Sequence, residues 1–338
     1  MATLVTGGAG FIGSHLVEAL ILRGDEVVVL DDFNDYYDPA VKERNLASIR
    51  DAPGLYLVKG DVADEATVAR AFAVRPIRAV VHLAARAGVR PSLRDPVLYD
   101  RVNIQGTLLL LEASHRATVE RVLFASSSSV YGLSASVPFN ESDPADRPIS
   151  PYAATKRASE MLCYTYHHLY GLPIACMRLF TVYGPRQRPD LAIHAFTHSI
   201  WTGRPIRVFG DGTSARDYTF VTDIVDGFLA VLDQPKPFAF EIFNLGNSHP
   251  VRLSALIRLI EDALGRPAII EPAPEQPGDV RLTYADIDKS RRLLGYRPRV
   301  SIEEGIERFC AWYLCEQDRE RLEASHAIAS GDHHVGAL

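Results

Sequence analysis

A glycine-rich turn near the N-terminus places the strongest constraint on the fold. The run Gly7-Gly8-Ala9-Gly10-Phe11-Ile12-Gly13 follows a short apolar segment, Ala2–Thr6, and opens a segment with helical periodicity, Phe11–Leu22. Glycines at this spacing allow a tight turn, leave no side chain against a bound pyrophosphate and let the helix pack closely on the sheet. A strand before and a helix after are the context that this motif requires. The turn therefore predicts a dinucleotide-binding βα unit.

Short apolar strands alternate with helices through the first half of the chain. After Ala2–Thr6, the expected strands are Glu26–Leu30, Leu55–Lys59, Ala79–Leu83, Arg121–Ala125 and Ile174–Arg178. The expected helices are Phe11–Leu22, Glu65–Phe72, Pro96–Ala117 and Pro151–Tyr170. Continuous apolar strands separated by helices are typical of a parallel sheet that is covered on both faces. We therefore expect an α/β fold with a doubly wound sheet of about seven strands.

The pattern changes after Phe180, where proline and glycine become frequent. The helices expected there, Ala192–Thr202, Leu253–Leu264 and Ser301–Cys315, no longer alternate strictly with strands. We expect a dinucleotide-binding domain of residues 1–179 and about 216–243, to which Val221–Leu232 belongs, and a smaller, interleaved substrate domain of residues 180–215 and about 244–318. Residues 321–338 are polar without periodicity and are expected to be disordered.

The composition excludes several classes of function. With 47% hydrophobic residues and a formal charge of −6, the 338-residue chain is expected to be a soluble globular protein that binds neither nucleic acid nor an anionic membrane. No apolar run reaches the roughly 18 residues that a membrane span needs, and the first strand begins too early for a signal peptide. The cysteines, Cys163, Cys176, Cys310 and Cys315, lack the paired spacing of a metal site. We expect a cytoplasmic protein with reduced thiols and no bound metal.

An acidic residue follows the glycine turn at the distance expected for a ribose ligand. Asp31 follows the second expected strand, 18 residues after Gly13. A carboxylate there accepts hydrogen bonds from both ribose hydroxyls and repels a 2′-phosphate, which favours NAD over NADP. Asp32 is the competing candidate. After the third and fourth strands, Gly60-Asp61-Val62 is placed to contact adenine, and His82-Leu83-Ala84-Ala85 offers small residues near the pyrophosphate.

A tyrosine and a lysine one helical turn apart form the candidate reaction centre. Tyr152 and Lys156 lie at i and i+4 of one expected helix and therefore on one face. The positive charges of Lys156 and of a nicotinamide would lower the pKa of Tyr152, so that a phenolate could act as a base near neutral pH. Ser127 would hydrogen-bond to the same substrate oxygen. This set predicts hydride transfer between a carbinol carbon and the nicotinamide; the alternative is an ordinary surface pair on a helix.

These motifs resemble the extended short-chain dehydrogenase/reductase family, and within it the nucleotide-sugar epimerases. The resemblance spans about residues 2–315 and rests on the glycine turn, on Ser127, Tyr152 and Lys156, and on the runs Phe180-Thr181-Val182-Tyr183-Gly184-Pro185 and Arg216-Asp217-Tyr218. Four further runs resemble UDP-glucuronate 4-epimerases: Ala87-Gly88-Val89-Arg90, Ser126-Ser127-Ser128-Ser129-Val130-Tyr131-Gly132, Pro185-Arg186-Gln187-Arg188-Pro189-Asp190 and Gln276-Pro277-Gly278-Asp279-Val280. The resemblance implies oxidation of a sugar at C4, rotation of the 4-keto sugar and return of the hydride to its other face, with NAD retained.

One position that differs among related enzymes bears on the reaction. Dehydratases and decarboxylases of the family usually carry an acidic residue just before Val-Tyr-Gly, where this chain has Ser129. A 4-keto uronate loses CO₂ readily unless its carboxylate is held in place, and a bidentate arginine would hold it. Arg188 is the candidate for this clamp, with Arg90, Ser128, Ser129 and Thr181 as candidate neighbours. The alternative for Arg188 and for Arg90 is a solvated loop arginine.

Arginines of the second domain are candidates for binding a nucleotide diphosphate. By resemblance, Arg207, Arg216 and Arg281 lie in segments that the family uses for UDP, and Arg216 belongs to its phosphate-contacting Arg-Asp-Tyr motif. Val208 would flank the uracil or would simply pack within the second domain. UDP-galactose 4-epimerases tend to have an arginine where Gln276 stands, so the phosphate contacts of this chain would be rearranged.

The function expected from these observations is NAD-dependent C4 epimerisation of UDP-glucuronate to UDP-galacturonate. A UDP-glucose/galactose-type 4-epimerase, a UDP-glucuronate decarboxylase and an NAD-binding regulator without catalysis are the alternatives. The helices expected at Pro96–Ala117 and Pro151–Tyr170 suit the four-helix dimer interface of the family. A homodimer is therefore expected, and packing of these helices within one subunit is the alternative.

Overall fold

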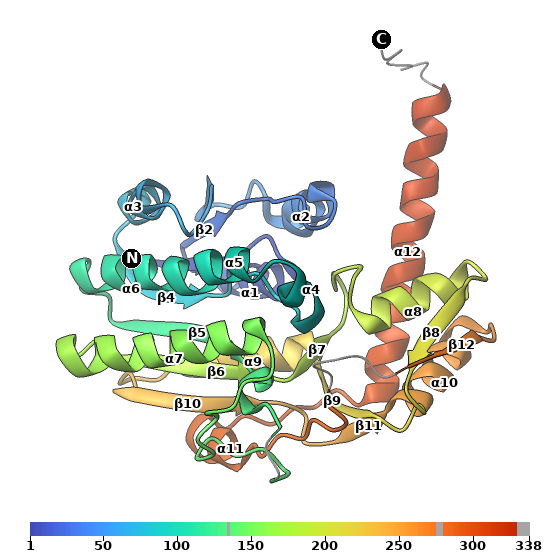
Figure 1. Cartoon of the computed structure of the whole chain (residues 1–338). Helices are drawn as coiled ribbons and strands as arrows, with labels where there is room; N and C mark the ends of the chain where they lie inside the picture. Colours follow the sequence, from blue (N-terminus) through green and yellow to red (C-terminus); the bar gives the residue numbers. More distant parts are fainter. Residues whose placement is uncertain (134–135, 275–279, 330–338) are drawn as a thin grey trace.

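A seven-stranded sheet forms the centre of the larger part of the molecule. The computed structural model describes residues 1–133, 136–274 and 280–329. All pairs in this sheet are parallel, in the order β10-β6-β5-β4-β1-β2-β3 (Figure 1). The strands are β1 (Ala2–Thr6), β2 (Val27–Asp31), β3 (Leu55–Lys59), β4 (Ile77–His82), β5 (Arg121–Ser127), β6 (Ile174–Leu179) and β10 (Phe240–Leu245). The predicted doubly wound parallel sheet is confirmed.

The strands bury alternate residues in two apolar cores, one on each face of the sheet. Val5 and Val29 pack on the same face as Leu16, whereas Leu4 and Val28 pack on the other. The first face is covered by α1 (Phe11–Leu22), α2 (Pro39–Leu46) and α9 (Val221–Leu232), and the second by α3 (Glu65–Val74), α6 (Gly106–Arg116) and α7 (Pro151–Tyr170) (Figure 1). Because both faces are covered, the inner strands are buried along nearly their whole length and consist mainly of apolar residues.

The smaller part of the chain carries two further sheets. One contains β7 (Thr181–Tyr183), β9 (Ala215–Phe220) and β11 (Pro250–Arg252), and the other pairs β8 (Pro205–Phe209) with β12 (Ile269–Ala273). The helices α8 (Ala192–Trp201), α10 (Leu253–Leu264) and α12 (Ile302–Ala329) accompany these sheets, and α11 (Asp288–Leu294) lies against β10 and α9. The expected domain boundaries differ by a few residues from the positions at which the chain passes from one sheet to another. Residues 216–220 belong to the smaller part, and β10 stays in the large sheet as far as Leu245, beyond residue 243.

The sequence prediction lacks three short helices, α2, α4 (Val89–Arg94) and α11. Helix α2 begins with a local signal, because the Asp38 carboxylate accepts a hydrogen bond from Ala40 N at 2.9 Å and Pro39 occupies the start of the helix. Its buried residues include Lys42 and Asn45. Because polar side chains occupy buried positions, the sequence of α2 lacks the apolar periodicity by which a helix is predicted.

The segment Pro96–Ala117, predicted as one helix, changes its helical type along its length. It consists of α5 (Pro96–Tyr99), a π-helical stretch (Asp100–Gln105) and α6. Asn103, in the π-helical stretch, is buried, and its side-chain oxygen accepts a hydrogen bond from Arg86 N at 2.8 Å. Its amide donates to Arg86 O and to Thr155 Oγ1, both at 3.0 Å. Asn103 therefore ties the loop after β4 to α7, and π-helical turns are frequent at functional sites.

The last helix is longer than predicted. The sequence predicts its end at Cys315 and disorder from residue 321, but α12 continues to Ala329 and extends away from the rest of the molecule (Figure 1). Good helix formers and charged pairs one turn apart, such as Glu316 with Arg319, stabilise such an exposed helix. The prediction of disorder is therefore wrong for residues 321–329. Residues 330–338, the rest of that segment, lie outside the described residues.

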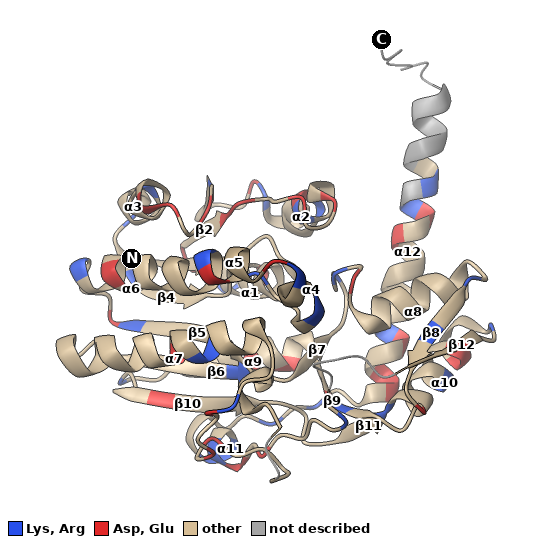
Figure 2. Cartoon of the chain, viewed as in Figure 1, with Lys and Arg blue, Asp and Glu red and all other residues tan. Residues whose placement is uncertain are grey.

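Charged residues are distributed over both parts of the molecule. Figure 2 shows Lys and Arg interspersed with Asp and Glu along most helices, including α12. Within the described ranges, no helix combines the length and the apolar character that crossing a membrane requires.

Candidate active site

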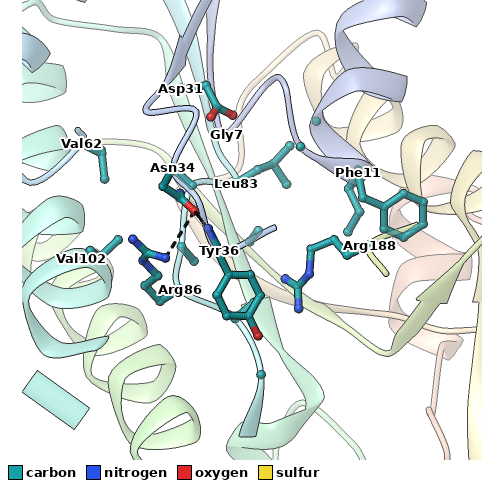
Figure 3. A pocket seen from close by; sticks show the side chains of 18 of the residues that line it. Gly7, Phe11, Asp31, Asn34, Tyr36, Val62, Leu83, Arg86, Val102 and Arg188 are labelled. Atoms are coloured by element: carbon teal, nitrogen blue, oxygen red, sulfur yellow. Dashed lines mark hydrogen bonds between the residues drawn. The ribbon is translucent and has the colours of Figure 1, made fainter. Parts of the chain in front are cut away.

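A cleft of about 340 Å³ lies where the carboxyl ends of the central strands face the second domain (Figure 3). Ligands bind at this edge in open α/β sheets. The predicted residues that line the cleft are Gly7, Gly10, Phe11, Ile12, Gly13, Asp31, Asp32, Asp61, Val62, Leu83, Ala84, Ala85, Ser127, Tyr152, Lys156, Thr181 and Arg188. The fold therefore gathers in one place the residues that the sequence analysis assigned to cofactor binding and to catalysis.

The glycine turn leaves space that other residue types would fill. A Cβ atom on Gly7 would lie 2.7 Å from the Ala84 nitrogen, and the φ of Gly7 is +68°. A Cβ atom on Gly13 would lie 2.1 Å from the Gly7 carbonyl oxygen. Both contacts are with backbone atoms, which cannot move aside as a flexible side chain can. The turn places the N-terminus of α1 against the cleft, where its N–H groups fit a pyrophosphate.

Asp31 is a buried carboxylate at the end of β2. It is 4% exposed and accepts hydrogen bonds from Ala9 N at 3.1 Å and Phe33 N at 3.0 Å. Lys42 donates to Asp31 at 2.9 Å and to Asp32 at 3.3 Å. The side chain of Asp32 is 31% exposed and that of Asp31 is 3% exposed, and both carboxylates line the cleft as candidate ribose ligands. The positive charge of Lys42 partly offsets the negative charges of Asp31 and Asp32. It therefore weakens the repulsion of a 2′-phosphate on which the expected preference for NAD over NADP rests.

The adenine end of the cleft lies after β3 and β4. The Asp61 carboxylate accepts a hydrogen bond from Ala63 N at 2.8 Å and forms an ion pair with Arg101 at 2.8 Å. Val62 is 5% exposed and offers an apolar surface beside it. Across the cleft, Ala84 N donates to the Thr6 hydroxyl at 3.2 Å, which holds the loop after β4 against β1. The sequence predicts that the adenine base lies between these walls.

The predicted catalytic residues reach the cleft from β5 and α7. Ser127 ends β5 and caps a 3₁₀-helix, Ser128–Tyr131, because its hydroxyl accepts a hydrogen bond from Ser129 N at 3.2 Å. Tyr152 lies in the first turn of α7, and its ring packs edge-on against Tyr99, with centroids 6.2 Å apart. Lys156 follows one turn later and is 4% exposed. These positions allow a hydroxyl, a phenol and an ammonium to act on one bound molecule.

The pKa values of the catalytic pair differ from the sequence expectation. Burial raises the pKa of Tyr152, while a hydrogen bond with Ser127 and the charge of Arg188 lower it. Burial lowers the pKa of Lys156 from 10.5 to about 8. The expectation that Lys156 lowers the pKa of Tyr152 needs correction, because Arg188 is the nearby cation whose charge acts on the phenol.

Arg188 reaches the cleft from the loop after β7. Its side chain is only 17% exposed, and it donates to both oxygens of Asp190, from Nε at 2.9 Å and from Nη2 at 2.8 Å. The guanidinium carbon lies 5.3 Å from the centroid of the Tyr36 ring, which comes from the connection after β2 (Figure 3). A solvated loop arginine would be far more exposed, so the position of Arg188 favours a role in the cleft.

Only one of the predicted neighbours of Arg188 lines the cleft with it. Thr181 does so from β7. Within the described ranges, the cleft lining does not include Arg90, Ser128 or Ser129. Arg90 is exposed and lies over the ring of Phe209, 4.5 Å from its centroid, so it connects α4 with the end of β8. Ser128 and Ser129 are half-buried in the 3₁₀-helix after Ser127.

The predicted nucleotide-binding arginines lie in the second domain, outside this cleft lining. Arg216 donates to the backbone carbonyl oxygens of Ala215 at 3.0 Å and Arg281 at 3.4 Å, so its guanidinium lies at the backbone of residue 281. Arg207 is exposed and lies 3.9 Å from Glu271. Val208 is 8% exposed and packs in the apolar core, as its alternative interpretation predicts. Gln276 and most of the run that contains it lie outside the described residues.

Asp217, the next residue of the Arg-Asp-Tyr motif, has a structural role. Its carboxylate is fully buried and accepts hydrogen bonds from the backbone nitrogens of Asn247 at 2.7 Å, Ser248 at 2.9 Å and Ala285 at 3.0 Å. Burial raises its pKa, and these three hydrogen bonds oppose that shift. Asp217 thus joins three separate segments and fixes the strand that presents Arg216.

Several cleft residues were missed by the sequence analysis. They are Asn34, Tyr36, Tyr37, Lys42 and Arg86. Four of the five come from the connection between β2 and α2 and from α2 itself, and Arg86 donates to the Asn34 side chain at 3.3 Å (Figure 3). A usable signal was present, because two adjacent tyrosines stand in a polar connection just after the candidate ribose ligand.

Within the part of the chain that the structure describes, no group of three or more His, Cys, Asp or Glu could hold a metal ion.

Comparisons with known proteins agree with this arrangement. The profile of the GDP-mannose 4,6 dehydratase family matches residues 4–309. A UDP-glucuronate 4-epimerase of Thermodesulfobacterium geofontis is 44% identical over 326 residues, which cover 96% of this chain and 98% of the relative. The crystal structure of the UDP-glucuronic acid 4-epimerase of Bacillus cereus, in complex with UDP-glucuronic acid and NAD, is 36% identical, with a TM-score of 0.88 over 92% of this chain and 98% of that one.

The fold alone does not separate the sugars. The crystal structure of a UDP-glucose 4-epimerase of Thermotoga maritima is 33% identical, with a TM-score of 0.86 over 94% of this chain and 100% of that one. The family match nevertheless spans most of the sequence, and the relatives are similar over nearly their whole length. The chain belongs to the epimerase and dehydratase family of the extended short-chain dehydrogenases/reductases.

Proposed function

We propose that this protein epimerises UDP-glucuronate at C4, with NAD as a retained cofactor. The observation that carries the proposal is the position of Arg188, a largely buried cation in the same cleft as Tyr152 and near enough to lower the pKa of its phenol. A sugar whose C4 hydroxyl meets Tyr152 would have its C6 group beside C4, so a cation here fits a substrate with a carboxylate at C6. The names of the similar proteins support this assignment.

The residues of the cleft fit NAD. Gly7 and Gly13 form a space that a Cβ atom would fill, and Asp31 ends β2 where a ribose hydroxyl would bind. Bound in this cleft, NAD would supply the hydride acceptor for the oxidation at C4 of the sugar and the hydride donor for its reduction. Tyr152 takes the proton of the C4 hydroxyl as the hydride leaves, and it gives the proton back when the other face is reduced. Ser127 holds the same oxygen, and the buried Lys156 lies one helical turn from Tyr152 in the same cleft.

The 4-keto intermediate makes the carboxylate clamp necessary. It is a β-keto acid, and its C5–C6 bond breaks easily when that bond lies perpendicular to the carbonyl plane and overlaps the carbonyl π system. A guanidinium that holds the carboxylate near the carbonyl plane prevents this overlap. An epimerase therefore needs Arg188 to restrain the intermediate, whereas a decarboxylase gains nothing from such a restraint. Ser129, in place of an acidic residue, adds to the argument against dehydration.

The test of this proposal is the variant Arg188→Ala. A lost charged hydrogen bond costs about 1.5–3 kcal/mol, so we expect the variant to bind UDP-glucuronate about 10–100-fold more weakly. UDP-glucose, which lacks the carboxylate, should bind variant and wild type equally. The two dissociation constants can be measured by calorimetry. Equal losses for both sugars would place Arg188 on the diphosphate or in the fold and would favour a neutral-sugar epimerase.

For the nucleotide end of the substrate, we propose Arg216 and Arg281. The support is the contact of the Arg216 side chain with the backbone of residue 281, together with the hydrogen bonds by which Asp217 fixes β9. Arginine binds phosphate oxygens in a bidentate manner, so both residues suit a diphosphate. Arg216→Ala should weaken UDP and UDP-glucuronate equally, which distinguishes this site from the carboxylate clamp.

We also propose a homodimer formed through α5, α6 and α7. Large apolar side chains are exposed on these helices, among them Val97 (76%), Leu108 (40%), Met161 (60%), Tyr164 (53%) and Leu169 (61%). A face of this kind is typical of an interface with a second copy. Light scattering should give twice the mass of the chain, and Met161→Glu together with Val97→Glu should give a monomer.

The free cysteines suit the reducing conditions of the cytoplasm, which we propose as the location.

A further inference from the structure

Two residues hold the guanidinium of Arg188, and the reaction as described uses neither of them. Asp190 accepts hydrogen bonds from Nε and Nη2 of Arg188 at 2.9 and 2.8 Å. Tyr36 donates its phenolic hydrogen to the same Asp190 carboxylate at 3.3 Å. The ring of Tyr36 also lies against the guanidinium, 5.3 Å from centroid to carbon (Figure 3). The three side chains thus form a closed set of contacts between the two domains.

The loop that carries Arg188 and Asp190 is anchored from within. Leu191 N donates to the Arg188 carbonyl at 3.2 Å, and Gln187 N donates to the Gly184 carbonyl at 3.1 Å. The Gln187 side chain is 3% exposed, and its amide donates to the Val182 carbonyl at 3.1 Å. These bonds fix the backbone on both sides of Arg188. The conformational freedom that these bonds leave to Arg188 is therefore that of its side chain.

The geometry leaves one edge of the guanidinium for a second carboxylate. A guanidinium has five N–H donors in one plane. Asp190 occupies the edge formed by Nε and Nη2, so the edge formed by the two Nη nitrogens is free of Asp190. A carboxylate bound end-on at that edge would lie near the guanidinium plane, which the two hydrogen bonds to Asp190 orient and against which the Tyr36 ring lies. The orientation of the bound carboxylate then depends on these two residues as well as on Arg188.

We propose that Asp190 and Tyr36 are positioning residues that fix the plane of the Arg188 guanidinium and thereby keep the substrate carboxylate near the C4 carbonyl plane. This inference rests on the proposed function and adds to it the residues that determine whether the intermediate keeps its carboxylate. Attraction alone does not protect the intermediate, because a charge that binds the carboxylate at any angle still permits overlap of the C5–C6 bond with the carbonyl. Protection requires a defined angle, and a defined angle requires a fixed guanidinium.

The side reaction to be measured follows from this chemistry. When the angle is lost, the C5–C6 bond breaks, CO₂ leaves, and the electron pair of the bond forms the enolate of the C4 ketone. A proton added at C5 then gives a UDP-4-keto-pentose. Because this ketone leaves before it is reduced, one equivalent of the reduced cofactor remains for each CO₂ released. The ratio of CO₂ to epimerised product is therefore a readout of carboxylate positioning that a merely structural role would not change.

The experiment compares Asp190→Ala, Asp190→Asn and Tyr36→Phe with wild type. Each variant protein is incubated with UDP-glucuronate, and products are followed by NMR together with absorbance at 340 nm. We expect Asp190→Ala to raise KM for UDP-glucuronate about 3–10-fold, the loss typical of one hydrogen bond, and to raise the ratio of CO₂ to epimer above that of wild type. Tyr36→Phe keeps the ring and should show a smaller rise in this ratio. UDP-glucose should bind all three variants as it binds wild type.

Controls separate this inference from the proposed function. Asp226→Asn, a partly exposed carboxylate paired with Arg299 away from the cleft, should behave as wild type. If wild type does not epimerise UDP-glucuronate at all, the proposed function fails before any variant is compared. If wild type epimerises it but the Asp190 variants release no more CO₂, the positioning role is wrong. Tighter binding of UDP-glucuronate by Asp190→Ala would also overturn it, because Asp190 would then compete with the substrate for Arg188.

Discussion

Lys156 donates a hydrogen bond of 2.6 Å to the carbonyl oxygen of Ala125. This bond fixes the ammonium group, which α7 carries, to the carboxyl-terminal part of β5. The ammonium also lies over the ring of Phe124, 4.9 Å from its centroid. Both contacts hold a cation that is almost completely buried, one helical turn after Tyr152. This burial determines the pH range in which the cation keeps its proton.

The pKa of Lys156 predicts a loss of activity in mild alkali. Burial lowers this pKa from 10.5 to about 8, so the ammonium is present below that pH and is lost above it. The value of kcat/KM for UDP-glucuronate should therefore fall as the pH rises through about 8, by up to about tenfold per pH unit. A pH profile from 6 to 10 checks this, and a flat profile up to pH 10 would show that the charge of Lys156 is not needed.

Loss of stability would not explain that decline. Because the pKa of Lys156 is lower in the folded chain than in the unfolded chain, the unfolded chain binds more protons between pH 8 and 10.5. Deprotonation of this group therefore stabilises the fold over this interval as the pH rises. Thermal unfolding measured at each pH of the profile provides the control.

Tyr152→Phe should remove turnover and leave binding intact. The phenylalanine ring can still pack edge-on against Tyr99, but the group that takes the C4 proton is gone. We expect a decrease in kcat of about 10²–10⁴-fold with a nearly unchanged dissociation constant for UDP-glucuronate. Stopped assays with excess enzyme can detect the residual rate. Activity within a factor of a few of wild type would mean that another group is the base.

Lys42→Met should weaken retention of the cofactor. Lys42 pairs with Asp31 and Asp32, and removal of one member of a buried ion pair typically costs about 3–5 kcal/mol. The variant should unfold at a lower temperature and purify with less NAD, which can be measured after denaturation by enzymatic cycling. Arg50→Met, at an exposed ion pair with Glu43, serves as the control and should retain NAD. A full complement of NAD in Lys42→Met would argue against a role for this lysine.

Gly13→Ala tests the close approach in the glycine turn. The added Cβ would meet the Gly7 carbonyl oxygen at 2.1 Å, so the first turn of α1 would have to shift away from the cleft. We expect loss of bound NAD, with activity decreased at least as much as NAD content. Gly24→Ala places its Cβ in open space and should cost only about 1 kcal/mol for its positive φ, without loss of NAD. Normal NAD content in Gly13→Ala would contradict this account of the turn.

The parallel sheet could be predicted from the sequence because its strands are buried on both faces. The expected strands Ala2–Thr6 and Leu55–Lys59 and the helix Pro151–Tyr170 have the same bounds in the structure. The Gly-rich turn and the pair Tyr152 and Lys156 could be assigned because short spacings along the chain determine which groups lie together. Long-range pairs carry no such signal in the sequence.

The connection between β2 and α2 shows what could not be predicted. Lys42 meets Asp31 only because a helix with a polar buried face forms there, and Tyr36 meets Asp190 across 154 positions of sequence. The pKa of Tyr152 was assigned to the wrong cation for the same reason, because the distance from Arg188 depends on how the two domains pack. The end of α12 was misjudged because polar residues outnumber apolar ones after Cys315, as they can in an exposed helix.

The central claim is that the hydride removed from C4 returns to the same carbon of a sugar that keeps its carboxylate. The most direct test is to incubate the purified protein in water with UDP-glucuronate deuterated at C4, without added NAD, and to follow the sugar by NMR. The account predicts UDP-galacturonate with deuterium still at C4 and no release of CO₂. Loss of deuterium from C4, formation of a pentose, or absence of turnover with protein that contains NAD would contradict it.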